Sequence, residues 1–329
     1  MTDSARLRFG IVTGRDPAGL SRDGELLAGE LRDRGHTAEP VVWTADDPGP
    51  GSFDALVLRS CWAYHEQPDR FRDWLDAASD AGLAVLNPLD AVRWNVHKSY
   101  LRDLAETGVD VVPTEWVPAS SDADLRSVLA ANGWERAVVK PAIGTSSTGV
   151  WRTSLEAAPS EQSRFDATLA EGDALVQQFA PEIADGELSF VFLGGQYSHA
   201  TKCFPADDEF RSHPSFGGTV RPYAPAGLTR EAARDVLLEA SDLLGIPLDR
   251  LPYARVDGLR RNGTFELMEL ELIEPYLGLE RASGAASRFA DAVLSALGSE
   301  RRSARSTPNR EQRSGEPTTP GDQRPHHRR

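Results

Sequence analysis

YARVDGLRRNGTFELMELELIEP, residues 253–275, has the pattern of two β-strands joined by a turn. Alternation along the second strand puts Glu269 and Glu271 on one face. Two carboxylates on one face repel each other unless a cation lies between them, and Mg²⁺ binds one or two carboxylates together with phosphate oxygens. A solvated strand face is the alternative, but the apolar neighbours Leu267 and Ile273 indicate a partly buried one. The stretch therefore predicts a metal and phosphate site on a β-hairpin.

The upstream strand adds an arginine and an aspartate to this site. Arg255 and Asp257 share the face of the two glutamates if the turn near Asn262-Gly263 holds an odd number of residues, whereas a two-residue turn would point Asp257 to the other face. We therefore predict a three-residue loop with Gly263 in the left-handed position. In that register Asp257 joins the metal ligands and Arg255 faces negative charge as it develops in a reaction.

A second motif is a loop rich in small residues. AVVKPAIGTSSTGVWR, residues 137–152, runs from an apolar strand ending at Lys140 into Gly144-Thr145-Ser146-Ser147-Thr148-Gly149 and then into another strand. Small residues let backbone N–H groups approach an anion. The lysine precedes the glycines and no helix follows them, so the pattern predicts a mobile hairpin tip over phosphates rather than a P-loop. A flexible surface turn is the alternative.

The chain before residue 90 alternates strands and helices, which predicts βαβ architecture with a parallel sheet. Its first strand-to-helix turn lacks the full GxGxxG pattern, so it gives little support to a dinucleotide site. A third strand leads into RSCWAYH, residues 59–65, which is a candidate acceptor site because α/β sheets bind ligands at strand carboxyl ends. Interdomain packing of Trp62 and Tyr64 is the alternative. The expected strands are 7–13, 38–43, 53–58 and 83–86, with helices over 22–34 and 71–78.

After residue 113 the expected strands pair as hairpins, which is typical of antiparallel α+β structure. A single helix over 90–107 precedes this change, followed by a strand over 109–113. Ser121 and Asp124 have the spacing of a capping box in front of a short helix. The expected hairpins pair 137–141 with 149–152 and 187–193 with 196–201, and further helices are expected over 229–244 and 285–297.

Composition limits the partners and the cellular location. The chain has 329 residues, with 36 Lys and Arg against 50 Asp and Glu, and a formal net charge of −14. An acidic chain argues against nucleic acid as the main partner. No apolar run is long enough for a membrane helix, and two cysteines are too few for a disulfide framework, so we expect a cytoplasmic protein that binds no membrane. Residues 299–329 hold eight Arg and almost no large apolar residue, which predicts a disordered tail.

Together these motifs resemble the ATP-grasp superfamily of ligases, most like prokaryotic glutathione synthetase and its relatives. The resemblance spans about residues 10–297 and also includes a Gln-Gln-Phe-Ala sequence at 177–180 and KCFPADDEFRSHPSFGG at 202–218. Three segments are similar to the cyclo-ligase that closes the ring of cycloserine: residues 57–78, 92–114 and 267–275.

The resemblance implies an α/β plus α+β chain with the ATP-grasp fold. It would comprise a Rossmann-like N-terminal domain (1–90), an ATP-grasp domain (91–298) with a small mobile lid at about 113–180, a C-terminal metal-binding lobe, and the tail (299–329). It also implies ATP and Mg²⁺, most simply two Mg²⁺ ions with Mn²⁺ as a substitute. The implied ATP-binding residues are Lys98, Lys140, Gly144, Ser146, Ser147, Gln178, Phe179, Ala180 and Glu187. The implied catalytic residues are Arg255, Lys202 and Arg211, and the metal ligands are Asp257, Glu269 and Glu271.

The implied reaction phosphorylates a carboxylate with ATP, and an amine then attacks the acylphosphate. The expected substrates are a small-molecule carboxylate and an amine, such as an amino acid or a small peptide-like compound. Glu271 stands where many relatives have Asn, which argues against glutathione synthesis but not against metal binding. Ring closure, as in the cycloserine cyclo-ligase, and a non-catalytic ATP-binding regulator are the alternatives. The sequence leaves open whether the chain forms a homo-oligomer.

Overall fold

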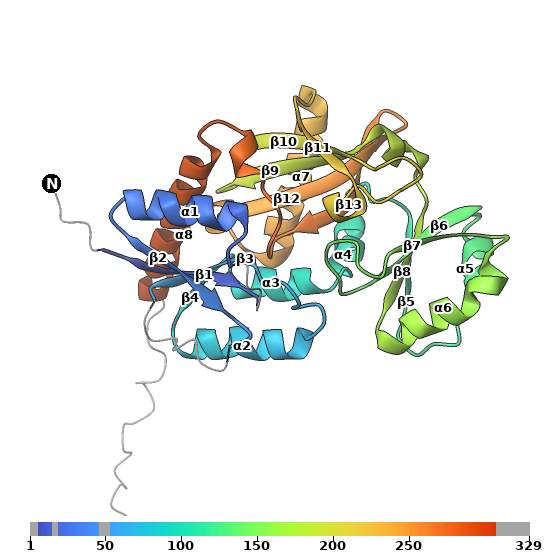
Figure 1. Cartoon of the computed structure of the whole chain (residues 1–329), viewed down its shortest axis with the longest axis horizontal. Helices are drawn as coiled ribbons and strands as arrows, with labels where there is room; N and C mark the ends of the chain where they lie inside the picture. Colours follow the sequence, from blue (N-terminus) through green and yellow to red (C-terminus); the bar gives the residue numbers. More distant parts are fainter. Residues whose placement is uncertain (1–5, 15–18, 46–52, 307–329) are drawn as a thin grey trace, which may run out of the picture.

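The computed structural model describes residues 6–14, 19–45 and 53–306, which form three β-sheets and the helices around them (Figure 1). The first sheet is parallel, in the order β2-β1-β3-β4, as the alternating pattern predicts. Helices α1 and α2 lie on its opposite faces in Figure 1. Its elements are β1 (Arg8–Thr13), α1 (Arg22–Asp33), β2 (Thr37–Val42), β3 (Ala55–Ser60), α2 (Pro68–Asp80) and β4 (Ala84–Leu86).

Two short helices connect this sheet to the rest of the chain, α3 (Leu89–Val96) and α4 (Tyr100–Glu106). The prediction of one helix over 90–107 is therefore wrong. The chain leaves the helical path at His97, whose backbone is extended, and the N–H of Lys98 then donates to Ala142 O (2.8 Å). This break matters because it brings Lys98 close to the loop that follows β6.

The second sheet is antiparallel, in the order β5-β8-β6-β7, and lies at one end of the molecule (Figure 1). The expected strand over 109–113 is absent as such, because the strand begins at Thr114. The expected capping box is also wrong, because Asp124 itself caps the helix by accepting from Ser127 N (2.7 Å). The elements are β5 (Thr114–Val117), α5 (Leu125–Ala131), β6 (Arg136–Pro141), β7 (Trp151–Ser154), α6 (Ala158–Glu171) and β8 (Ala174–Gln178); the sequence analysis did not predict α6.

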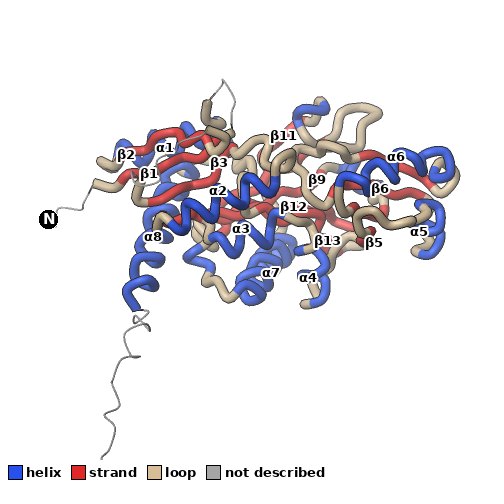
Figure 2. The backbone as a smooth tube through the Cα atoms, turned by 90° about the horizontal axis from the view of Figure 1, so that it is seen from below, coloured by secondary structure: helices blue, strands red, loops and turns tan. Residues whose placement is uncertain are grey.

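The third sheet, in the order β11-β10-β9-β12-β13, is also antiparallel and lies between the other two (Figures 1 and 2). Apolar side chains on one of its faces pack against α7, and this cluster forms the largest part of the core. Its elements are β9 (Glu187–Leu193), β10 (Gln196–Phe204), β11 (Thr219–Tyr223), α7 (Gly227–Leu244), β12 (Tyr253–Arg261) and β13 (Thr264–Glu271).

Tyr253 joins the first sheet to the third. Its fully buried hydroxyl contacts the carbonyl oxygens of Leu58 (3.0 Å) and Ile273 (2.9 Å). Phe289 of α8 (Ala285–Ser306) packs edge-on against the Tyr253 ring. These buried contacts fix the end of β3 relative to the residues that follow β13, and both line the cavity described below.

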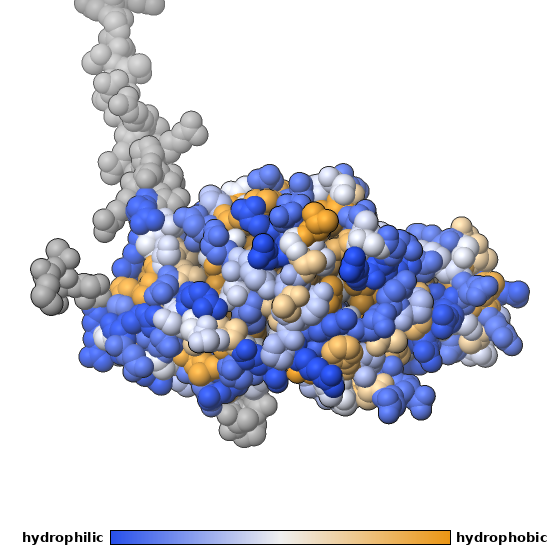
Figure 3. Space-filling view, turned by 90° about the horizontal axis from the view of Figure 1, so that it is seen from above, coloured by the Kyte–Doolittle hydropathy of each residue, from blue (hydrophilic) through white to orange (hydrophobic). Residues whose placement is uncertain are grey.

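Helix α8 changes the interpretation of the C-terminal tail. It continues to Ser306, so the first eight residues of the segment expected to be disordered are helical; residues 307–329 lie outside the described part of the chain. Glu300 forms an ion pair with Arg250, and Arg301 with Asp54. Hydrophilic residues dominate the face shown in Figure 3, with apolar residues scattered among them. Within the described residues, no helix is long and apolar enough to cross a membrane.

Candidate active site

A cavity of about 480 Å³ lies between the three sheets. Its walls come from the end of β3, from β6, β8 and the loop between β6 and β7, and from β9, β12 and β13. Most of the predicted site residues meet here: Lys98, Lys140, Gly144, Ser146, Ser147, Gln178, Phe179, Ala180, Glu187, Arg211, Arg255, Glu269 and Glu271. Segments separated by more than a hundred residues in the sequence therefore form one site.

The β12–β13 hairpin corrects one prediction and confirms another. The turn has two residues, Asn262 and Gly263, both with positive φ, so the predicted three-residue loop is wrong. A β-bulge restores the register: Asp257 pairs with Glu269, Gly258 pairs with Leu267, and Met268 is the extra residue. Asp257 and Glu269 are thus directly opposite each other, and they share a face of the hairpin, as the sequence analysis expected.

Gly258 explains where the bulge lies. A Cβ atom at this position would be 2.3 Å from Glu266 O and 2.5 Å from the Phe265 ring. Only glycine permits this close approach of the two strands. Gly258 is thus the signal for the bulge in the sequence. Counting whether the turn holds an odd or an even number of residues does not reveal it.

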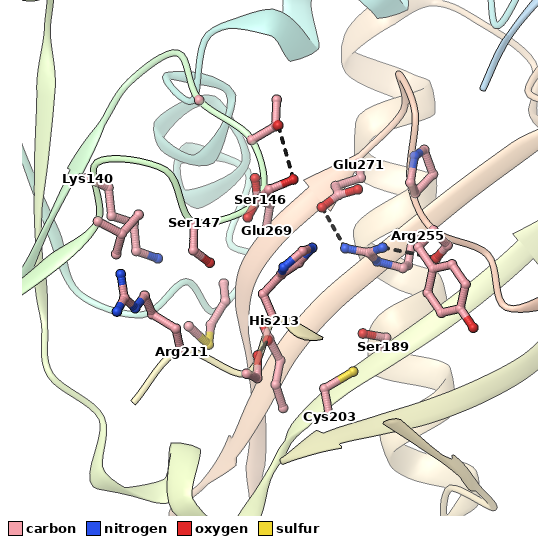
Figure 4. A pocket seen from close by; sticks show the side chains of 18 of the residues that line it. Lys140, Ser146, Ser147, Ser189, Cys203, Arg211, His213, Arg255, Glu269 and Glu271 are labelled. Atoms are coloured by element: carbon pink, nitrogen blue, oxygen red, sulfur yellow. Dashed lines mark hydrogen bonds and ion pairs between the residues drawn. The ribbon is translucent and has the colours of Figure 1, made fainter. Parts of the chain in front are cut away.

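Arg255 is held between two of the predicted metal ligands. Its Nε is 2.9 Å from both carboxylate oxygens of Asp257, and one terminal nitrogen donates to Glu271 Oε1 (2.6 Å). The other terminal nitrogen donates to Tyr276 O (3.0 Å). Figure 4 shows Arg255 facing Glu271 across the cavity floor. Burial raises the pKa of Glu271 to about 7, even though Arg255 lowers it.

Glu269 is paired with a lysine from a distant part of the chain. Lys98 contacts the Glu269 carboxylate and also donates to Gly144 O (3.2 Å). Burial raises the pKa of Glu269, but Lys98 and Lys140 outweigh that effect and the net pKa lies below the usual range. Two lysines predicted to bind phosphates therefore lie next to a carboxylate predicted to bind metal.

Lys140 lies at the end of β6, just before the glycine-containing loop. Its Nζ donates to Gln177 Oε1 (2.8 Å), and burial lowers its pKa. In the loop, Ser146 and Ser147 have φ values of +52° and +57°. Gly149 packs so closely on Pro141 that a Cβ would be 2.9 Å from its ring. The loop connects two strands, as the sequence analysis expected for a hairpin tip.

The part of the cavity next to the end of β8 is more apolar. Phe179, Ala180 and Met268 belong to a small cluster with Ile183 and Leu259. The guanidinium group of Arg136 lies 4.6 Å from the Phe179 ring centroid. This apolar wall next to backbone groups of a strand end is suited to a flat heterocycle.

Glu187 borders the same region and has a perturbed pKa. Ser212 donates a hydrogen bond to its carboxylate, and burial together with Asp257 raises the Glu187 pKa to about 7. The sequence analysis quoted Gln177 and Ser212 within its motifs but gave neither a role in the site, although both lie directly beside residues to which it gave one. Their signal is weak, because a lone Gln or Ser has no distinctive spacing.

Two predicted catalytic residues have different outcomes. Arg211 lines the cavity, is paired with Glu209 (2.7 Å) and stacks on Phe216 at 3.5 Å. Lys202 does not line it. Thr201 and Cys203 point into the cavity from β10, so alternation directs Lys202 to the other face, where its Nζ lies 5.4 Å from the Phe204 ring centroid. The structure therefore places Lys202 outside the cavity that the other predicted residues share.

The candidate acceptor segment after β3 is divided between the cavity and the core. Arg59, Trp62 and Tyr64 line the cavity. Cys61 is fully buried in the core, where burial raises its pKa well above the usual value, and His65 also lies outside the lining. Both aromatic residues thus remain candidates for substrate contact.

The carboxylates fit Mg²⁺ by their chemistry, although their present partners are cations of the protein. Among the described residues, no three His, Cys, Asp or Glu side chains are grouped closely enough to hold a metal ion. Arg255 and Lys98 instead contact Asp257, Glu269 and Glu271. Burial, with smaller contributions from Asp257 and Glu269, raises the pKa of Glu271, and a hard cation with oxygen ligands would favour its ionised form.

One cavity lies between a parallel sheet, a small antiparallel sheet that carries Lys140, and a larger antiparallel sheet that carries acidic residues. This arrangement defines the ATP-grasp class of ligases. Structural comparison agrees: D-alanine–D-alanine ligase from Bacillus anthracis, crystallised with ATP, superposes with a TM-score of 0.65 at 15% identity, over 91% of this chain and 99% of that one. At that identity the likeness shows the fold.

Sequence comparison identifies the family within this class. Residues 9–87 match the family described as the N-terminal domain of D-cycloserine synthetase DcsG. The cycloserine biosynthesis protein DcsG of Streptomyces lavendulae is 33% identical over 304 residues, which are 87% of this chain and 98% of that protein. The crystal structure of D-cycloserine synthetase DcsG superposes with a TM-score of 0.80 at 30% identity, over 88% of this chain and 99% of that one. The chain belongs to the family of DcsG.

A more distant relative supports the resemblance to glutathione synthetase. Glutathione synthetase of Parasynechococcus marenigrum is 28% identical over 183 residues, 54% of this chain and 52% of that protein. The expected ATP-grasp resemblance is thus confirmed. The chain is an ATP-dependent ligase that forms carbon–nitrogen bonds and releases ADP and phosphate.

Proposed function

We propose that this ligase activates the carboxylate of an amino acid or small peptide-like compound as an acylphosphate, which a nitrogen nucleophile then attacks. The observation that carries the proposal is the gathering of Lys98, Lys140, Arg211 and Arg255 with the acidic hairpin in one cavity. In the first step a carboxylate oxygen bonds to the γ-phosphorus of ATP and ADP leaves. In the second step nitrogen bonds to the carbonyl carbon, phosphate leaves, and the nitrogen loses its proton.

The lysines and the loop would hold the nucleotide. Lys98 and Lys140 supply positive charge for the phosphates, and the loop containing Gly144, Ser146 and Ser147 supplies backbone N–H groups. At the apolar end, backbone groups around Gln178, Phe179 and Ala180 would bind the adenine, and Glu187 the ribose hydroxyls. The division into residues 1–90 and 91–298, with a mobile lid at about 113–180, remains part of this proposal.

The acidic hairpin would hold the metal. Asp257, Glu269 and Glu271 are the proposed ligands, for two Mg²⁺ ions or for Mn²⁺ in their place. When bound, the metal neutralises charge on the triphosphate. Arg255 would stabilise the negative charge that develops on the carbonyl oxygen when nitrogen attacks the carbonyl carbon, because its guanidinium lines the same cavity. Arg211 would hold the phosphate or the substrate carboxylate.

Ring closure is the second candidate, and the likeness to D-cycloserine synthetase over almost the whole of that protein favours it. In that reaction the nucleophile and the acylphosphate belong to one molecule. ADP formation measured over a panel of amino acids and their derivatives, each alone and with an added amine, distinguishes the two. ADP formation with one compound alone supports ring closure when the product has the mass of one substrate molecule less water, whereas a product made from two molecules shows intermolecular ligation. Tight ATP binding without turnover by any compound would instead favour a non-catalytic ATP-binding regulator.

A further inference from the structure

The cavity extends beyond the phosphate-binding residues towards the first sheet. This part is lined by Arg59, Trp62 and Tyr64 from the end of β3 and by the segment Ile273–Tyr276 that follows β13. None of these residues has a role in holding the nucleotide. The buried contacts of Tyr253 with the carbonyls of Leu58 and Ile273 fix the two segments relative to each other.

Glu274 is the unexplained group in this region. Its Oε2 is buried and has no hydrogen-bond partner among the described residues, although the side chain lines the cavity. A buried acceptor left without a donor costs about 1–3 kcal/mol. Burial raises the pKa of Glu274 to about 8, despite the nearby Arg59 and a backbone hydrogen bond from Cys61. The folded protein therefore maintains a carboxyl group of which one oxygen, Oε2, has no donor in the described part of the chain.

Arg59 does not satisfy this group. Its guanidinium is held by Pro275 O, lies 3.8 Å from Asp23, and stacks 4.9 Å from the Tyr253 ring centroid. Its Nε and Nη1 have no hydrogen-bond partner among the described residues. Arg59 thus fixes the segment that follows β13 and favours the ionised form of Glu274, but it does not donate to Oε2.

The surroundings of Glu274 suit a cation. Trp62 and Tyr64 line the same region, and aromatic faces attract ammonium groups. Burial and then the charge of Glu274 raise the pKa of Tyr64, with smaller contributions from Glu271 and Glu269, which indicates a negative potential at this wall. A donor that carries positive charge would satisfy Oε2 and lower this potential.

We propose that Glu274 binds the ammonium group of an amino-acid substrate. This inference rests on the proposed function, because it assigns the substrate side of the same cavity. It narrows the substrate class to compounds that carry an ammonium group in addition to the carboxylate that is phosphorylated. Glu274 would act in binding, since it is not required for phosphoryl transfer.

Glu274→Gln tests the inference because it removes the charge and keeps the shape. The probes are the amino acid that gives the highest rate of ADP formation in the panel and the same acid without its amino group, used as a competitive inhibitor. We expect the substitution to raise KM for the amino acid by about tenfold to a hundredfold, because one charge-assisted hydrogen bond is lost. KM for ATP should change less than about twofold. Discrimination between amino acid and deaminated analogue should fall by the same factor.

Glu231→Gln is the matched control, because Glu231 is an exposed carboxylate on α7 outside the cavity. It should leave both constants unchanged. Undiminished discrimination in Glu274→Gln would overturn the inference, as would tighter binding of the deaminated acid by the parent protein. If no compound drives ADP formation, the proposed function fails first. The panel is then titrated calorimetrically into protein saturated with Mg²⁺ and a non-hydrolysable ATP analogue, and no binding by any ammonium compound would overturn the subsite.

Discussion

Replacing Lys140 with Met should weaken nucleotide binding without weakening the fold. Lys140 lies near the end of the strand that leads into the glycine-containing loop, and its Nζ donates a hydrogen bond to Gln177 Oε1 (2.8 Å). Burial lowers its pKa, so the ligand-free fold disfavours its charged form. Met fills nearly the same volume and needs no partner, so the melting temperature should stay the same or rise slightly.

The expected loss of affinity follows from the interaction that Lys140 would make. A hydrogen bond between charged partners contributes about 1.5–3 kcal/mol, which corresponds to roughly a tenfold to 150-fold change in Kd. The assay is calorimetric titration of a non-hydrolysable ATP analogue in the presence of Mg²⁺. Gln177 Oε1 would lose its donor, whereas Gln177 Nε2 would keep the hydrogen bond that it donates to Thr114 Oγ1 (3.0 Å).

Lys202→Met is the control for this experiment. Lys202 has the same chemistry but lies on the other face of β10, so its replacement should leave Kd for the nucleotide unchanged. Equal nucleotide affinity of Lys140→Met and the parent protein would refute the phosphate-binding role. An equal loss in both variants would refute the placement of Lys202 outside the site.

Three further predictions concern the hairpin, the C-terminal helix and the buried acid. Glu269→Gln should reduce Mg²⁺-dependent ADP formation at least about a hundredfold while the melting temperature changes by no more than a few degrees, since removing a crowded carboxylate also relieves repulsion; undiminished Mg²⁺-dependent ADP formation would contradict the metal-binding role. Truncation before Ser299 should lower the melting temperature by a few degrees because it removes the ion pairs of Glu300 and Arg301, and an unchanged value would show that the last turns of α8 contribute nothing. Burial raises the pKa of Glu187 to about 7, so the folded chain holds this proton more tightly than the unfolded chain does. The stability of the ligand-free protein should therefore fall as the pH rises from about 5 to about 8. A Glu187→Gln variant that shows the same fall in thermal melts would contradict this.

Much of the fold could be predicted because its signals are local. The alternation of apolar strands and helices in the first ninety residues specifies the parallel sheet, and the hairpins of the second and third sheets follow from strand patterns separated by short turns. The predicted single helix over 90–107 failed because its break depends on a tertiary contact, the hydrogen bond from Lys98 N to Ala142 O. No local pattern encodes that partner.

The sequence identified most residues of the site but not how they are arranged. The sequence analysis expected Asp257 and Glu269 to share a face, but for the wrong reason, since the bulge at Met268 compensates for a two-residue turn. Lys202 was misplaced because the resemblance gives an order of residues along the chain, whereas the face of β10 on which each lies depends on the register with β9 and β11. Glu274 was not singled out, because only the structure reveals that its buried oxygen lacks a donor.

The transfer of oxygen from substrate to phosphate tests the acylphosphate reaction most directly. The substrate that drives ADP formation would be prepared with ¹⁸O in both carboxylate oxygens and turned over with unlabelled ATP in unlabelled water. Activation of the carboxylate by phosphoryl transfer predicts one ¹⁸O atom in each phosphate released, because the oxygen that attacks the γ-phosphorus leaves with it. Phosphate without ¹⁸O, formed at the same rate as ADP, would contradict this mechanism.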